Sequence, residues 1–237
     1  MVQQPVVNTG KSDLLHEVGE FIFATIWLGV AFGIAMAGGY RAFGNLPMLR
    51  IVILQSLIVV VFAFVLHELA HRVVARHYGH KAVFRMWVPG LVLAALVSLT
   101  GWLFAAPGGV YIDMADAGTP QGKARLGKSA LAGPIVNMVL ALLFVGATML
   151  AAVIFSTYVS VAPGVSMDRI EPVARFFVGV TLVGVEINLW LALFNLLPFG
   201  SFDGLKVFAW SKKAWIISFA AAVALYGAWW WIQGQAL

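Results

Sequence analysis

Residues 51–75 read IVILQSLIVVVFAFVLHELAHRVVA. Residues 51–66 carry no charge, and a helix of this whole stretch would be about 37 Å long, enough to cross a hydrocarbon core of about 30 Å. The stretch therefore predicts a membrane-spanning helix. Its last third contains His67-Glu68-Leu69-Ala70-His71. Ionisable residues are costly at such a depth, so this motif is expected to have a function.

The H-E-x-x-H motif has the spacing of a metal site. Residues i and i+4 share one face of a helix, so the imidazoles of His67 and His71 point in the same direction. Two ring nitrogens can then take two corners of a tetrahedral Zn²⁺ site, with Glu68 alongside as general base for water. One zinc ion per chain is predicted. The alternative is that these residues face a polar bundle interior as a proton relay.

The composition of the 237-residue chain also indicates a membrane protein. Hydrophobic residues make up 62% and charged residues 11%, too few charges to cover a water-soluble globule. The chain has no cysteine, which excludes disulfides, thiolate metal sites and cysteine nucleophiles. The net charge of +5 is small and is concentrated beside the apolar runs, so it predicts membrane topology, and no nucleic-acid partner is expected.

Five apolar runs are long enough to cross a bilayer. A sixth run, 91–106, is short and has Pro-Gly pairs at both ends, so it either crosses the membrane or enters it and returns. The sequence predicts an all-α polytopic protein with about five transmembrane helices and a re-entrant or membrane-associated segment near 87–112. We expect a single domain over residues 1–237, with core spans at 51–75, 129–155 and 176–197 and flanking spans at 21–38 and 214–232.

Basic residues indicate how the chain is oriented. The positive-inside rule places clusters of Lys and Arg next to membrane spans in the cytoplasm. Such clusters are Arg72, Arg76, Lys81 and Arg85; Lys123, Arg125 and Lys128; and Lys206, Lys212 and Lys213. All three share one side only if segment 91–106 re-enters. We therefore expect re-entry, and a motif within the cell membrane nearer its cytoplasmic side.

Two histidines leave a metal ion one protein ligand short. Downstream acids in polar loops or on the opposite side are set aside, which leaves Glu186 and Asp203. Asp203 is preferred, because Pro198 ends the preceding helix and Gly204 permits a tight turn, so its carboxylate is expected on irregular backbone. With a re-entrant 91–106, Asp203 also falls on the same side as His67. Glu186 lies mid-helix, where a hydrogen bond between helices is its alternative role.

The chain resembles the site-2 proteases, a family of intramembrane zinc metalloproteases. The resemblance rests on the H-E-x-x-H motif, on Ala132-Gly133-Pro134-Ile135-Val136-Asn137, and on Asn195-Leu-Leu-Pro198 followed by Asp203-Gly204. Pro107-Gly108-Gly109-Val110 is similar to the family's Gly-rich strand or re-entrant region. The loop departs from the family pattern at Ser201, where a second proline is frequent, and at Lys206, near which Arg or His is common.

The resemblance implies that His67, His71 and Asp203 bind Zn²⁺ and that Glu68 is the catalytic base. It implies that Asn195 and Asn137 lie near the metal, where each supports the site or contacts substrate; a structural hydrogen bond is favoured for Asn137. Short β-strands in segment 87–112 fit the same resemblance.

The implied activity is hydrolysis of a peptide bond within or near a transmembrane segment of a membrane-protein substrate, as in regulated intramembrane proteolysis. The expected partners are that segment and the lipid bilayer, and no oligomeric state is predicted. The alternative function is an ion- or proton-coupled transporter that uses the same buried ionisable residues. The sequence shows no duplicated half of the kind common in transporters.

Overall fold

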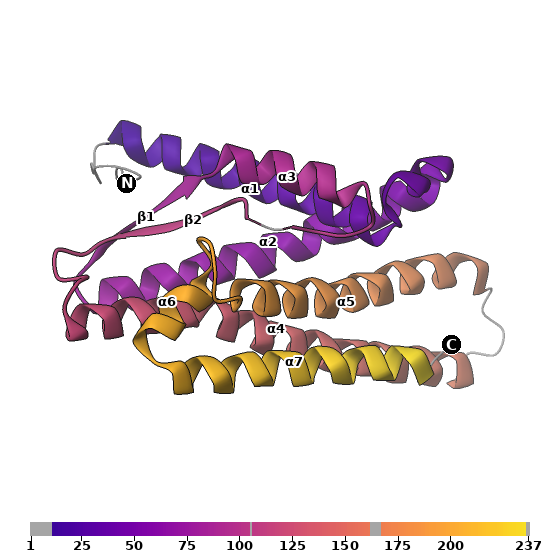
Figure 1. The fold of residues 1–237 in the computed structure, drawn as a ribbon. Coiled ribbons are helices and arrows are strands. Elements are labelled where there is room, and N and C mark those ends of the chain that lie inside the picture. The colour runs from indigo at the N-terminus through magenta and orange to yellow at the C-terminus, as the bar shows by residue number, and fades with distance from the viewer. Residues whose placement is uncertain (1–10, 105, 162–166, 236–237) are drawn as a thin grey trace.

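The computed structural model describes residues 11–104, 106–161 and 167–235. Five long helices form an elongated bundle (Figure 1). They are α1 (Lys11–Met36), α2 (Leu46–His77), α4 (Pro120–Val161), α5 (Met167–Asn195) and α7 (Lys212–Gln235). Each contains a stretch long and apolar enough to cross a membrane, which confirms the predicted all-α polytopic fold.

Several helices extend beyond the apolar runs that predicted them. Helix α1 begins at Lys11, ten residues before the run at 21–38, and α2 covers 46–77 where 51–75 was expected. The apolar run marks only the part of a helix that suits lipid, whereas helical hydrogen bonds continue into the polar ends. At the start of α2, the Asn45 side chain accepts a hydrogen bond from the Met48 amide, which caps the helix.

The helices pack through small residues and apolar side chains. A Cβ on Gly33 of α1 would lie 2.6 Å from the Ile53 Cα, so only glycine permits this close approach to α2. The main core gathers buried side chains of α1, α2, β1, α3 and α5, including Leu28, Val60, Phe84, Leu91 and Ile187. Large apolar residues such as Phe62, Leu143 and Ile217 are exposed, as expected for surfaces that face lipid.

The segment between α2 and α4 leaves one end of the bundle and returns to it. Strand β1 (Lys81–Met86) pairs antiparallel with β2 (Gly108–Asp113), from Lys81 opposite Asp113 to Met86 opposite Gly108. Between them lies α3 (Val88–Ser98), about 17 Å long and too short to cross a bilayer. The two ends of the segment are hydrogen-bonded neighbours, so it re-enters, and it contains the short strands expected from the resemblance.

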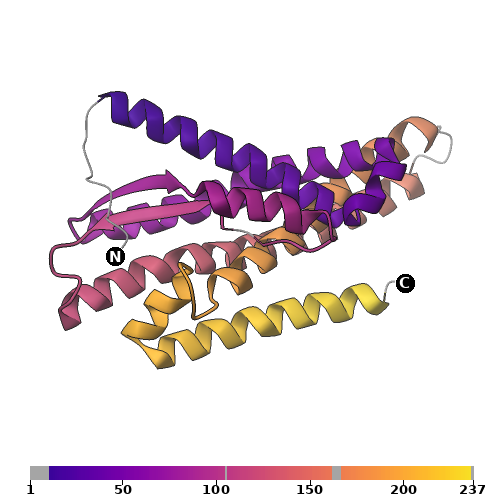
Figure 2. The same cartoon turned by 45° about the horizontal axis from the view of Figure 1, so that its top comes forward.

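The strands lie at the end of the bundle that also holds α6 (Asp203–Trp210), while the 3-10 helix η1 (Gly39–Gly44) lies at the other end (Figure 1). Figure 2 shows the two strands and α3 along the side of the bundle next to α1. The three basic clusters sit on elements at the strand end: the end of α2 with β1, the start of α4, and α6 with the start of α7.

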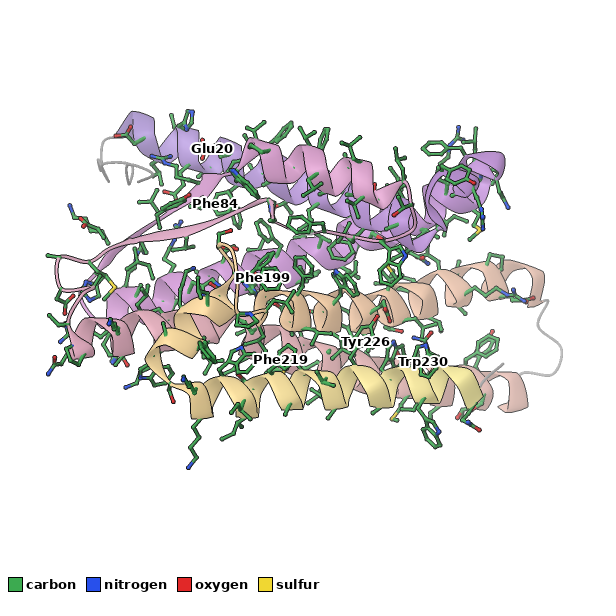
Figure 3. The ribbon with its side chains drawn as sticks, in the orientation of Figure 1. Glu20, Phe84, Phe199, Phe219, Tyr226 and Trp230 are labelled. Atoms are coloured by element: carbon green, nitrogen blue, oxygen red, sulfur yellow. The ribbon has the colours of Figure 1, made fainter. Side chains whose placement is uncertain are left out.

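Two carboxylates of α1 hold β1 in place. Glu17 accepts hydrogen bonds from the Phe84 amide at 3.0 Å and from the Arg72 guanidinium. Glu20 accepts from the Met86 amide at 3.2 Å. Figure 3 shows Glu20 on α1 close to Phe84 on β1. Because these amides belong to the strand backbone, α1 fixes the position of the strand pair beside the site described next.

Candidate metal centre

His67, His71 and Asp203 converge on one point. The Nε2 atoms of His67 and His71 are 2.9 Å apart. Asp203 Oδ2 lies 3.0 Å from His71 Nε2 and 3.4 Å from His67 Nε2. All three residues are buried, and α2 supplies the histidines while α6 supplies the aspartate.

The arrangement fits a tetrahedral zinc ion. Ligand atoms about 2.0–2.1 Å from Zn²⁺ lie about 3.3 Å from one another, close to the three separations in this triangle. Lone pairs that converge so closely repel one another unless a cation or a proton lies between them. Nitrogen and oxygen donors without thiolate also match the catalytic zinc sites that keep a fourth position open.

The other ring nitrogen of each histidine has a hydrogen-bond partner that sets the ring's orientation. His71 Nδ1 lies 2.7 Å from the Ser129 carbonyl oxygen, which only accepts, so this nitrogen carries the proton. His67 Nδ1 contacts Asn137 Oδ1. Both contacts leave Nε2 unprotonated and directed at the metal position, the arrangement that zinc ligation requires. Asn137 is fully buried, and its Nδ2 donates to the Ala63 carbonyl oxygen and to Asn188 Oδ1.

Asp203 is the first residue of α6, whereas the sequence predicted irregular backbone at this position. The irregular part is the preceding loop, residues 196–202, which reverses the chain after α5. A Cβ on Gly204 would lie 2.1 Å from the Leu196 carbonyl oxygen, so only glycine allows α6 to begin this close to the end of α5. The carboxylate reaches the histidines because of this tight approach.

Lys206, one turn further along α6, holds the second carboxylate oxygen. Its Nζ donates to Asp203 Oδ1 at 3.0 Å, so Oδ2 faces the two imidazoles. The Lys206 ammonium favours the charged form of the Asp203 carboxyl, against the cost of burying that charge. The aspartate therefore offers an anionic oxygen to a metal ion.

Glu68 lines a small cavity next to this triangle, together with Asn195 and the β2 glycines Gly108 and Gly109. The cavity measures about 60 Å³, enough for a few water molecules. Glu68 Oε2 is buried and has no hydrogen-bond partner among the residues that the structure describes. The side chain of Asn195 donates to the Leu191 carbonyl oxygen at 2.9 Å. Glu68 thus places an unpaired carboxylate oxygen, as judged from the described residues, next to a cavity that can hold water.

Glu186, the other candidate ligand, lies outside this cluster. It accepts hydrogen bonds from the Tyr226 hydroxyl at 2.7 Å and the Trp229 indole at 2.9 Å. These bonds join α5 to α7 in the half of the bundle away from the strands, where Figure 3 labels Tyr226. The alternative role of Glu186, a hydrogen bond between helices, is the one that the structure shows.

Sequence reasoning missed three residues around the site: Lys206 as a partner of Asp203, Asn188 as a partner of Asn137, and Gly133 against the imidazoles. Asn188 had a detectable signal, because an amide inside an apolar helix requires a hydrogen-bond partner. Gly133 was quoted only as part of the A-G-P element. Its role follows from the distance between α4 and α2, which depends on tertiary packing.

Gly133 gives a direct test of the site. A Cβ at this position would lie 2.5 Å from His71 Nε2 and 2.6 Å from His67 Nε2. Gly133→Ala should displace both imidazoles and weaken zinc binding by about tenfold or more, the scale of changes that disturb ligand orientation. Zinc affinity is measured by competition with a chelator. Gly146→Ala in the same helix, where the added Cβ meets nothing within 4 Å, is the matched control. Equal affinities in the two variants would contradict the geometry.

A helix with H-E-x-x-H and a converging aspartate, inside a bundle of apolar helices, defines a metal-dependent hydrolase of the membrane. The sequence profile of peptidase family M50 matches residues 55–218. A protein of Methanocaldococcus jannaschii named "Putative zinc metalloprotease" is 40% identical over 168 residues, which cover 70% of this chain and 75% of that protein. No solved structure matches the chain.

The chain belongs to peptidase family M50, the site-2 protease family. It is a zinc metalloprotease and a multi-pass membrane protein.

Proposed function

We propose that this protein is an intramembrane endopeptidase that hydrolyses a peptide bond within or near a transmembrane segment of a membrane-protein substrate. The depth of the metal centre supports the proposal. His67 follows the uncharged residues 51–66 of α2, about 24 Å of helix, which is shorter than a hydrocarbon core of about 30 Å. A core of that thickness extends past His67, so a substrate bond is expected to enter the bilayer region to reach Glu68.

The residues of the site divide the reaction between them. His67, His71 and Asp203 would hold one zinc ion, which supplies Lewis acidity and a lowered pKa for water. Glu68 accepts the proton of the water that attacks the peptide carbonyl carbon. The same carboxyl group then donates that proton to the leaving amine as the C–N bond breaks. The unpartnered Glu68 Oε2 is in keeping with this role.

A helical substrate must unwind before it can react. The carbonyl groups of a transmembrane helix are hydrogen-bonded within that helix, so an attackable bond needs local unwinding. The cavity beside Glu68 is narrow, but Gly108 and Gly109 on its wall present no side chain. The cavity is too small for an intact helix, so we expect only an unwound segment to bring its backbone to Glu68.

The orientation follows from charge. The three basic clusters lie on elements at the end of the bundle that holds the metal centre, so the positive-inside rule supports a site nearer the cytoplasmic side of the cell membrane. In this proposal residues 1–237 act as one protease domain, the lipid bilayer and the substrate segment are its partners, and regulated intramembrane proteolysis is the process it serves.

A designed reporter tests the proposal. Full-length protein and a single-span substrate are reconstituted in vesicles, and product masses locate the cleaved bond. Replacing one central Leu of the substrate span by Gly weakens its helix by about 1 kcal/mol and should raise the cleavage rate up to about fivefold. The same Leu→Gly change in a soluble flank should have no effect. Cleavage confined to the soluble flank would contradict the intramembrane assignment.

A further inference from the structure

Asn188 is a buried amide of α5 that the proposed reaction does not use. Its side chain is 0% exposed in a helix otherwise rich in apolar residues. It does not line the cavity at Glu68, and its contacts are to the protein interior. Its Nδ2 donates to the Gly184 carbonyl oxygen at 2.8 Å, and its Oδ1 accepts from Asn137 Nδ2 at 2.9 Å. Asn188 is therefore one bond removed from the residue that contacts His67.

The donors and acceptors in this network allow only one arrangement. The Gly184 carbonyl oxygen cannot donate, so the amide nitrogen of Asn188 faces it and the amide oxygen faces Asn137. Asn137 Nδ2 then has two acceptors, Asn188 Oδ1 and the Ala63 carbonyl oxygen at 3.1 Å. Its oxygen is left to accept from His67, which places the imidazole proton on Nδ1.

Without Asn188, the Asn137 amide nitrogen would lose one of the two hydrogen-bond acceptors that hold its orientation. The Ala63 carbonyl would be its remaining acceptor, and this oxygen is four residues before His67 in α2, where it also accepts from the helix backbone. A flipped Asn137 amide would direct an N–H at His67 Nδ1. The imidazole proton would then move to Nε2, the nitrogen that faces the metal position, and block ligation.

We infer that Asn188 is a positioning residue: through Asn137 it fixes the His67 tautomer that binds metal. The inference rests on the proposed role of His67 as a ligand. A side chain of α5 would thus determine the tautomer of His67 on α2, through Asn137 on α4. His71 needs no such relay, because a backbone carbonyl fixes its tautomer.

The test measures zinc affinity of the full-length protein in detergent by competition with a chelator. Asn188→Leu, which removes both polar groups at similar volume, should weaken zinc binding about tenfold, the low end of effects from groups that orient ligands. Asn188→Asp, whose carboxyl oxygen still accepts from Asn137, should stay near wild type. Ser218→Ala is the matched control, because Ser218 is buried and bonds only to carbonyls of its own helix, α7.

Two further measurements separate positioning from a general loss of stability. If Asn188 acts through Asn137, the Asn137→Ala variant and the Asn137→Ala/Asn188→Leu double variant should bind zinc equally weakly. Nitrogen-15 shifts of His67 in zinc-free wild type should show a proton on Nδ1, whether or not Nε2 shares one with His71 or Asp203, and this reading needs no variant to fold.

Three results would overturn the inference: zinc affinity of Asn188→Leu equal to that of Ser218→Ala, losses that multiply in the double variant, or a His67 without a proton on Nδ1 in the zinc-free wild type. Wild-type protein that binds no zinc would instead contradict the proposed metal site itself.

Discussion

Replacing Glu68 by Gln should lower the cleavage of a membrane reporter by about 10²–10⁴-fold, the usual contribution of general acid–base catalysis. Gln keeps the size of the side chain and its place beside the cavity, but it cannot take a proton from water at neutral pH. Glu68 is not one of the three converging ligand residues, so zinc content should stay at the wild-type level. The expected result is a folded, zinc-loaded and inactive protein.

The measurement pairs reporter cleavage in vesicles with metal analysis of the same preparation. Glu186→Gln is the matched control, because it makes the same chemical change in a carboxylate whose partners among the described residues are Tyr226 and Trp229, outside the metal cluster. This control should cleave at close to the wild-type rate. Cleavage by Glu68→Gln within tenfold of wild type would remove Glu68 from the mechanism.

The parts of the site that the sequence predicted are those set by local geometry. His67, Glu68 and His71 lie within five residues of one helix, and helical periodicity alone places both imidazoles on one face. The position of Glu68 next to the two histidines could also be predicted without tertiary information. Because ionisable residues are costly inside an apolar helix, the motif was predicted to bind metal or catalyse a reaction and not merely to pack.

The distant ligand was predictable for a different reason. Lipid restricts the chain to a few crossings, so counting them together with the basic clusters sufficed to place Asp203 at the same end as His67. The antiparallel pairing of β1 with β2 confirms the re-entrant path on which that count depended. The prediction of irregular backbone at Asp203 was wrong, because the close approach of Gly204 to Leu196 lets a helix begin directly at Asp203.

The supporting contacts could not be read from the sequence. Asn137 and Asn188 are 51 positions apart, and their hydrogen bond depends on the rotation of α4 against α5. Hydrophobic periodicity does not fix that rotation here, because helices in lipid are apolar on all sides and show little amphipathic pattern. Lys206 was noted only as a departure in sequence, and its bond to Asp203 depends on where α6 begins.

Asp203→Ala should abolish stoichiometric zinc binding, with a loss of affinity above about 100-fold, because removing a ligand costs more than disturbing one. His67 and His71 would remain, but two imidazoles on one helix leave the ion without its only anionic ligand. Zinc also stabilises the folded protein, by a free energy that grows with the logarithm of its affinity, so wild type should show a zinc-dependent rise in melting temperature that Asp203→Ala lacks. Chelator-treated wild type should lose the zinc-dependent rise and still melt cooperatively, which separates loss of metal from misfolding. Asp113→Ala, an exposed carboxylate at the end of β2, should keep both zinc and the shift. Full zinc occupancy in Asp203→Ala would show that the convergence of α2 and α6 does not form the metal site.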